Sequence, residues 1–249
     1  MDIAEHIAAL REAGRLLTAT ARRAGPDAPV PTCPKWRVRD LLTHTGGVHR
    51  WATAFVAEGR TEPMDAETRA RYRTAPPRDD DLPDWFADGH AALVAALEAA
   101  PPDLVCWTFF PAATPLAFWA RRQAHETIIH RADAELAAGD PVIAPDPALA
   151  ADGIDELVGG MLLHRGRLRA DPPRTLAVRT ADTGESWLVR VGADRVETRR
   201  GAASEPADCT VTGPAAALYL LLWNRGGPAA VRVSGDRSTL DLWRDRAVV

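Results

Sequence analysis

The feature that most constrains this chain is a change in the spacing of its apolar residues near residue 170. Before that point apolar side chains recur every three or four residues, as on one face of an α-helix. After it, short stretches rich in Val, Thr and Trp alternate with turn residues, which is typical of strands. The sequence therefore predicts an α+β fold with a helical domain at residues 1–170 and a small α+β domain at residues 171–249.

Five segments of the first part have helical spacing and are bounded mostly by proline or glycine. They are residues 2–23, 38–58, 83–100, 116–138 and 147–167. Residues 59–81 are polar and proline-rich, which predicts a long loop. Gly46 and Gly47 weaken the second helix by about 1 kcal/mol each. Four amphipathic helices bury their apolar stripes best against one another, so the first four predict an up-down four-helix bundle.

The second part combines strands with two helices. TLAVRTA, ESWLVRVG, DRVETRR and ADCTVTG predict a meander of strands. PAAALYLLLWNR is helical in pattern, AVRVSGD predicts a further strand, and RSTLDLWRDR predicts a last helix.

Composition limits the possible classes of function. The net charge of −4 without a basic cluster argues against nucleic acid as a partner. Nowhere do 18 apolar residues run together, so we expect no membrane span. Cys33, Cys106 and Cys209 are far apart, which argues against a disulfide framework or a cysteine zinc site. We expect a cytoplasmic monomer or homodimer.

The residues best suited to chemistry lie in the predicted helix at 116–138. His125 and His130 point about 140° apart on a helix, so they do not form the HExxH zinc motif. Glu126 and His130 do share a face, with Arg122 one turn earlier and Asp133 near the same stripe. A carboxylate and an imidazole at this spacing can supply two ligands to one metal ion.

A third ligand is available from the helix at 38–58. His44 lies among apolar residues at helical spacing, and an imidazole buried without a partner costs on the order of 1–3 kcal/mol. Coordination by His44, Glu126 and His130 would satisfy all three side chains. Two histidines and one carboxylate leave open positions and suit Zn²⁺ first, with Fe²⁺, Ni²⁺ or Co²⁺ as alternatives. Asp40, one turn before His44, could orient its ring.

Spacing alone leaves simpler interpretations open. Glu126 and Arg122 at this spacing are often only a solvated ion pair, and a lone core histidine such as His44 is often merely hydrogen-bonded. His49 and His125 lie off the ligand face and are expected to support the ligands or lie on the surface. For His6, His90 and His164 we expect structural roles.

Two longer strings carry a family resemblance. WRVRDLLTHTGGVHRW and WARRQAHETIIHRADAELAAG resemble the mycothiol-dependent maleylpyruvate isomerase family of DinB-like metalloenzymes. The resemblance implies a DinB-like bundle that binds a divalent metal through His44, Glu126 and His130. TGESWLVRVG, LLLWNRGG and VRVSGD are similar to the family's small α+β domain, which is akin to sterol-carrier-protein folds. That domain contributes an arginine to the active-site mouth, matched here to Arg225, with Arg232 nearby.

The resemblance implies mycothiol as cofactor and a small electrophile as substrate. A dication lowers the pKa of a thiol from about 8.5 and so supplies thiolate for attack. We expect an enzyme of the S-transferase type, in which the thiol adduct is kept. The alternatives are a thiol-dependent cis-trans isomerase of the maleylpyruvate type, a metal-dependent hydrolase of an amide or ester, and a non-catalytic binding protein.

Overall fold

The protein is described by a computed structural model that covers residues 1–74, 78–165 and 168–247. It divides into two compact units, Met1–Ile143 and Ala144–Val249. This division falls earlier than the boundary that the sequence predicts near residue 170. The reason is that the helix beginning at Pro147 packs against a helix of the second unit. Apolar spacing identifies a helix but does not say which core it joins.

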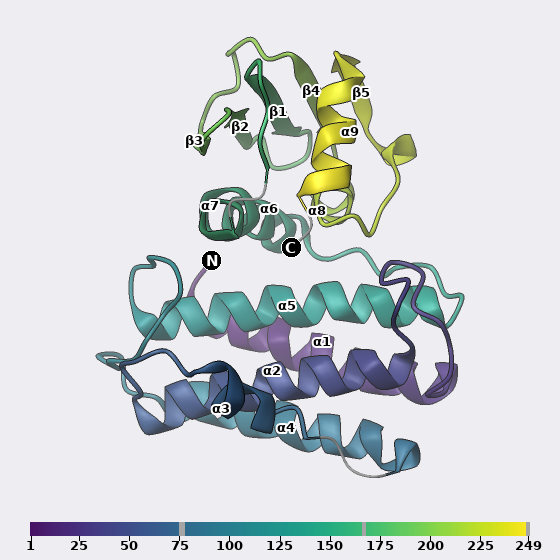
Figure 1. The fold of residues 1–249 in the computed structure, drawn as a ribbon, viewed down its shortest axis with the longest axis vertical. Coiled ribbons are helices and arrows are strands. Elements are labelled where there is room, and N and C mark those ends of the chain that lie inside the picture. The colour runs from purple at the N-terminus through teal and green to yellow at the C-terminus, as the bar shows by residue number, and fades with distance from the viewer. Residues whose placement is uncertain (75–77, 166–167, 248–249) are drawn as a thin grey trace. The chain divides into compact units, whose positions relative to one another are not determined.

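The first unit is the expected four-helix bundle, with a fifth, short helix in the long connection (Figure 1). Helix α1 packs against α5 and α4, and α2 packs against the same two partners. The bounds are α1 Ile3–Ala24, α2 Val38–Glu58, α3 Ala66–Arg71, α4 Leu82–Ala99 and α5 Pro115–Ala137, with a 3₁₀ turn at Asp79–Asp81. The four long helices begin and end within a residue or so of the predicted positions.

Helix α3 lies inside the stretch 59–81 that was expected to be a loop. Asp65 caps it by accepting a hydrogen bond from the backbone of Thr68, and Arg71 pairs with Glu67 one turn away. Local capping therefore makes a helix where polar composition predicts none.

The glycine pair of α2 permits close packing. A Cβ at Gly46 would lie 2.3 Å from the ring of Trp85, and one at Gly47 would lie 3.2 Å from the backbone of Arg73. The propensity cost expected from these glycines is thus accompanied by close approaches that a larger residue would prevent.

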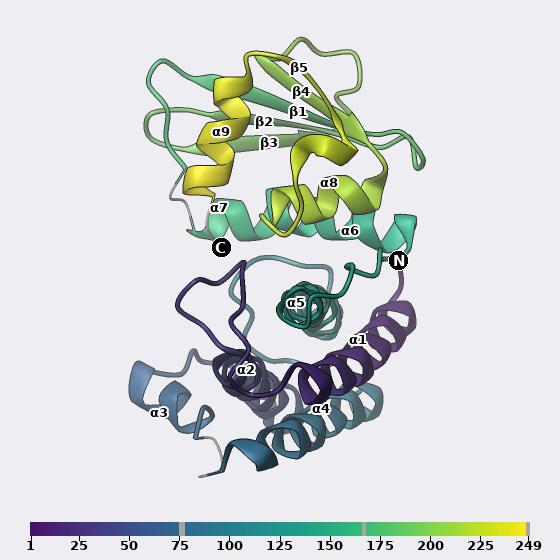
Figure 2. The same ribbon diagram turned by 90° about the vertical axis from the view of Figure 1, so that its right-hand side faces the viewer.

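The second unit is a five-stranded sheet with its helices on one side (Figure 2). The strand order is β3-β2-β1-β4-β5, where β1 pairs with β4 in parallel and the other pairs are antiparallel. The predicted meander thus holds for three strands, and β4 returns beside β1. The elements are α6 Pro147–Glu156, a π-helical turn Leu157–Met161, α7 Leu162–Arg165, β1 Arg174–Thr180, β2 Ser186–Val191, β3 Val196–Arg200, β4 Cys209–Gly213, α8 Ala215–Leu222, β5 Arg232–Gly235 and α9 Arg237–Arg246.

Two buried tryptophans anchor the core of this unit. The indole of Trp187 in β2 donates to the carboxylate of Asp155 in α6, and that of Trp243 in α9 donates to the backbone carbonyl of Leu222. The end of the predicted helix 147–167 lies outside the described residues. No helix in the described part of the chain is long and apolar enough to cross a membrane.

Candidate metal centre

Two neighbouring helices of the bundle bring the three predicted ligands together. His44 comes from α2, and Glu126 and His130 come from successive turns of α5. The Nε2 atoms of His44 and His130 each lie 3.3 Å from Oε1 of Glu126. One donor atom from each residue lies within 4.8 Å of the other two.

These distances fit a metal ion. Zinc bonds of roughly 2.0–2.2 Å in a tetrahedral arrangement place neighbouring donor atoms about 3.3–3.5 Å apart. The two histidine-to-carboxylate distances of 3.3 Å match this donor-to-donor distance. The donor set of two imidazoles and one carboxylate also leaves a coordination position for a further ligand. The residues present therefore fit the implied divalent metal.

Arg122 holds the second oxygen of Glu126. Its Nη2 lies 3.2 Å from Oε2, and its side chain is only 2% exposed. Burial favours the protonated form of Glu126, but hydrogen bonds from the two histidines and the charges of His130 and Arg122 outweigh it and hold the pKa of this carboxyl well below its usual value. With Glu126 19% exposed, the pair is therefore largely buried and not the solvated one that helical spacing alone allows.

Asp133 holds the other side of His130. Its Oδ2 lies 2.9 Å from Nδ1 of the imidazole, and its Oδ1 accepts a hydrogen bond from Thr32. This contact turns Nε2 of His130 toward Glu126. Burial favours the neutral imidazole, but the two carboxylates outweigh it and raise the pKa of His130 to about 9. The i, i+3 spacing of His130 and Asp133 could have indicated that Asp133 orients His130. No pattern in the sequence indicates that Thr32 donates a hydrogen bond to Asp133.

His44 has a different environment from His130. Burial lowers its pKa, and the hydrogen bond to Glu126 offsets this only in part. The ring of Trp36 lies 4.8 Å from that of His44 and 5.9 Å from that of His130, centroid to centroid. Trp36 therefore forms an apolar wall beside both imidazoles, and it was missed because it lies in a loop without periodic pattern.

Asp40 does not take the role that the sequence suggested. It is exposed, and its Oδ2 accepts a hydrogen bond from the backbone of Arg37 at 2.8 Å, which caps the start of α2. The prediction that it orients His44 is therefore wrong, because capping of the helix end already occupies this carboxylate.

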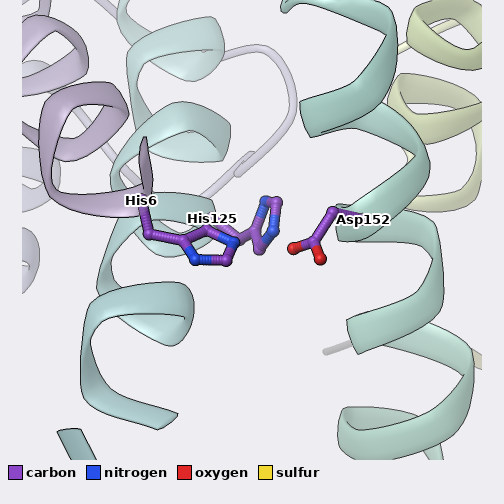
Figure 3. Close-up of side chains that lie close together, drawn as sticks. All are labelled: His6, His125 and Asp152. Atoms are coloured by element: carbon purple, nitrogen blue, oxygen red, sulfur yellow. The ribbon is translucent and has the colours of Figure 1, made fainter. Parts of the chain in front are cut away.

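The remaining histidines of the first unit are buried outside the ligand triad. His49 bonds Thr127 through Nε2 at 2.9 Å, and its ring lies 5.2 Å from that of His90. His6 and His125 lie edge to face with their centroids 6.1 Å apart (Figure 3). His49 and His125 are fully buried, so neither is a surface group.

Arg225 belongs to the second unit. It follows α8, is half-buried, and its Nη1 donates to the backbone carbonyl of Trp223 at 2.8 Å. Its participation in the site stays a prediction.

Fold and site together define the class: a two-unit α+β protein whose helical bundle carries a two-histidine, one-carboxylate centre. The comparisons then identify the family. Residues 7–135 match the mycothiol maleylpyruvate isomerase N-terminal domain, and residues 148–242 match the C-terminal domain of the same family. The chain belongs to the mycothiol-dependent maleylpyruvate isomerase family, and it is thus a thiol-dependent enzyme.

Solved structures support the fold. A mycothiol-dependent maleylpyruvate isomerase carrying a histidine-to-alanine substitution aligns with a TM-score of 0.64 at 14% identity, over 94% of this chain and 93% of that one. A second structure of a mycothiol-dependent maleylpyruvate isomerase has a TM-score of 0.62 with the same identity and coverage. The curated protein sequences gave no match.

Proposed function

We propose that this enzyme uses a divalent metal, most favourably Zn²⁺, held by His44, Glu126 and His130, to activate mycothiol for attack on a small electrophile. The observation that carries the proposal is the ligand geometry: two imidazole nitrogens each lie 3.3 Å from one carboxylate oxygen, and all three donors lie within 4.8 Å of one another, in a member of a mycothiol-dependent family. A bound dication would lower the pKa of the thiol enough for thiolate to form near neutral pH.

The chain's own residues prepare the site for this chemistry. Arg122 fixes Oε2 of Glu126 and leaves Oε1 facing the two imidazoles. Asp133 orients His130. Trp36 places apolar surface beside the rings of both histidines. Together they hold three donors in place before a metal or a thiol arrives.

The fate of the thiol adduct separates the two leading reactions. The thiolate first adds to a conjugated cis double bond, which becomes a single bond. If this single bond rotates and the thiol then leaves, the product is the trans isomer. If the adduct is kept, the reaction is S-transfer, which the sequence favoured. The family's name supports isomerisation, and both reactions share the first step on the same site.

The placement of the available bases disfavours hydrolysis. A metal-dependent hydrolase needs a general base beside the attacking water. Asp40 is engaged in capping α2, and Nε2 of His49 is bonded to Thr127. The second ring nitrogen of His49, Nδ1, has no hydrogen-bond partner among the described residues but is buried, so neither residue is well placed as that base.

Arg225 is our proposed partner for a carboxylate of the substrate or the thiol. A guanidinium can bind a carboxylate through two parallel hydrogen bonds, which a lysine cannot do. We therefore expect Arg225→Lys to lose most turnover and to keep its metal. Unchanged kinetics would direct attention to another arginine, of which Arg232 is the nearest in sequence.

The deciding experiment is calorimetric titration of mycothiol into the zinc-loaded protein, with the metal-free protein as control. Binding that requires metal supports the proposal, and equal or absent binding in both forms contradicts it. Turnover of maleylpyruvate with substoichiometric mycothiol then separates the reactions. Isomerisation leaves the free thiol undiminished, whereas S-transfer consumes one thiol for each product formed.

A further inference from the structure

The segment after α3 brings a cationic side chain to the candidate metal centre. The backbone of Arg73 and the carbonyl of Tyr72 would each lie 3.2 Å from a Cβ built on Gly47, so this segment lies directly against α2. Gly47 is one helical turn after His44, and residues at this spacing are neighbours on a helix surface. Arg73 therefore lies beside His44, although the two are far apart in sequence.

The guanidinium of Arg73 is available for a ligand. It is exposed, and within the described part of the chain it forms no ion pair or side-chain hydrogen bond. Arg71, two residues earlier, is also exposed but pairs with Glu67 at 2.7 Å. Arg73 thus packs its side-chain stem on α2 one helical turn from His44 and carries a planar set of donors without a carboxylate of its own.

The charge at the centre favours an anion as the occupant. Arg122 offsets Glu126, and buried Asp133 offsets half the charge of a dication, which leaves one net positive charge when both histidines are neutral ligands. Arg73 adds a second positive charge on an exposed side. A neutral electrophile forms no ion pair with this guanidinium, whereas a carboxylate can bind it in fork geometry.

We propose that Arg73 is a specificity-determining residue that binds a carboxylate of the electrophilic substrate beside the ligand triad. That the substrate is an electrophile is taken from the proposed function, and the inference rests on it. The site itself, an anion subsite built by Gly47 and Arg73, can be tested without turnover.

The test uses the zinc-loaded full-length protein and monomethyl fumarate, an electrophile with one carboxylate, titrated in the absence of thiol. We expect Arg73→Gln to weaken binding about tenfold, as loss of one charge-assisted contact implies. Arg71→Gln is the matched control because it removes an exposed arginine of the same segment, and it should bind as the wild type does. The zinc content should be equal in all three proteins.

Two outcomes overturn the inference: equal affinity in the wild type and Arg73→Gln, or no binding of the monoester to the wild type. A kinetic comparison adds a control for general damage. If thiol addition is observed, Arg73→Gln should lower kcat/KM for monomethyl fumarate about tenfold and leave dimethyl fumarate unchanged. Equal losses with both esters would also count against a carboxylate subsite. Failure of the proposed function has a different signature, which is the absence of metal-dependent mycothiol binding whatever the result for Arg73.

Discussion

Metal binding at this centre should release about one proton, and that proton should come from His130. In the ion-free protein the two carboxylates raise the pKa of His130 to about 9. At pH 7.5 the imidazole is therefore about 97% protonated, and it must lose this proton to become a ligand. His44, with its pKa lowered by burial, and Glu126, with its pKa held well below its usual value, are already in their binding forms.

The magnitude follows from the same pKa. Competition by the proton reduces the apparent metal affinity about 30-fold at pH 7.5, which is about 2 kcal/mol. The affinity should rise close to tenfold for each pH unit up to about 9 and then level off. Below the pKa of His130 the proton and the metal compete for Nε2, and above it they do not, which fixes the sign of the effect.

The assay is calorimetric titration of Zn²⁺ at pH 7.5 in several buffers that differ in ionisation enthalpy. The slope of observed heat against buffer enthalpy gives the number of protons released, which should be about one. The substitution Asp133→Asn keeps the shape of this side chain but removes the negative charge that faces Nδ1 of His130. It should bring the slope toward zero and lower the affinity at high pH about 10–100-fold.

A proton lost from zinc-bound water contributes equally to the slopes of the wild type and Asp133→Asn. The difference between the two slopes therefore isolates the proton of His130. A wild-type slope near zero, or the same slope in Asp133→Asn, would refute the reasoning.

Three further predictions concern the ligands, the packing and the division of the chain. His44→Ala should lose at least about 100-fold in zinc affinity and keep its helical circular dichroism, and retention of one tightly bound equivalent would exclude His44 as a ligand. Gly46→Ala should lower the free energy of unfolding in urea by about 1–3 kcal/mol, because its Cβ would meet Trp85 at 2.3 Å, whereas Gly159→Ala, with open space around it, should cost less than about 1 kcal/mol. A chain ending at Ile143 should fold, bind one zinc ion and lack activity, and wild-type turnover by this fragment would remove the second unit from the mechanism.

Local pattern was sufficient for much of the fold. Proline and glycine at the ends of the helices, together with 3.6-residue spacing, placed the four long helices of the bundle nearly to the residue. The alternating stretches placed the strands, because a period of two is a local property as well. The pairing of Glu126 with His130 follows from helical geometry alone, since residues four apart share a face.

Only the tertiary structure decided the features that depend on contacts between distant segments. It assigned α6 to the second unit, set Asp133 between His130 and Thr32, placed Trp36 over the imidazoles, and brought Arg73 against α2. The partner of α6 is another helix, and apolar spacing does not tell which core a helix joins. The other contacts join loops to helices, and loops carry no period from which a partner could be read. The sequence by itself thus determined which side chains can act together within one helix. The packing of the bundle determined how close His44 comes to the pair on α5 and what surrounds the three donors.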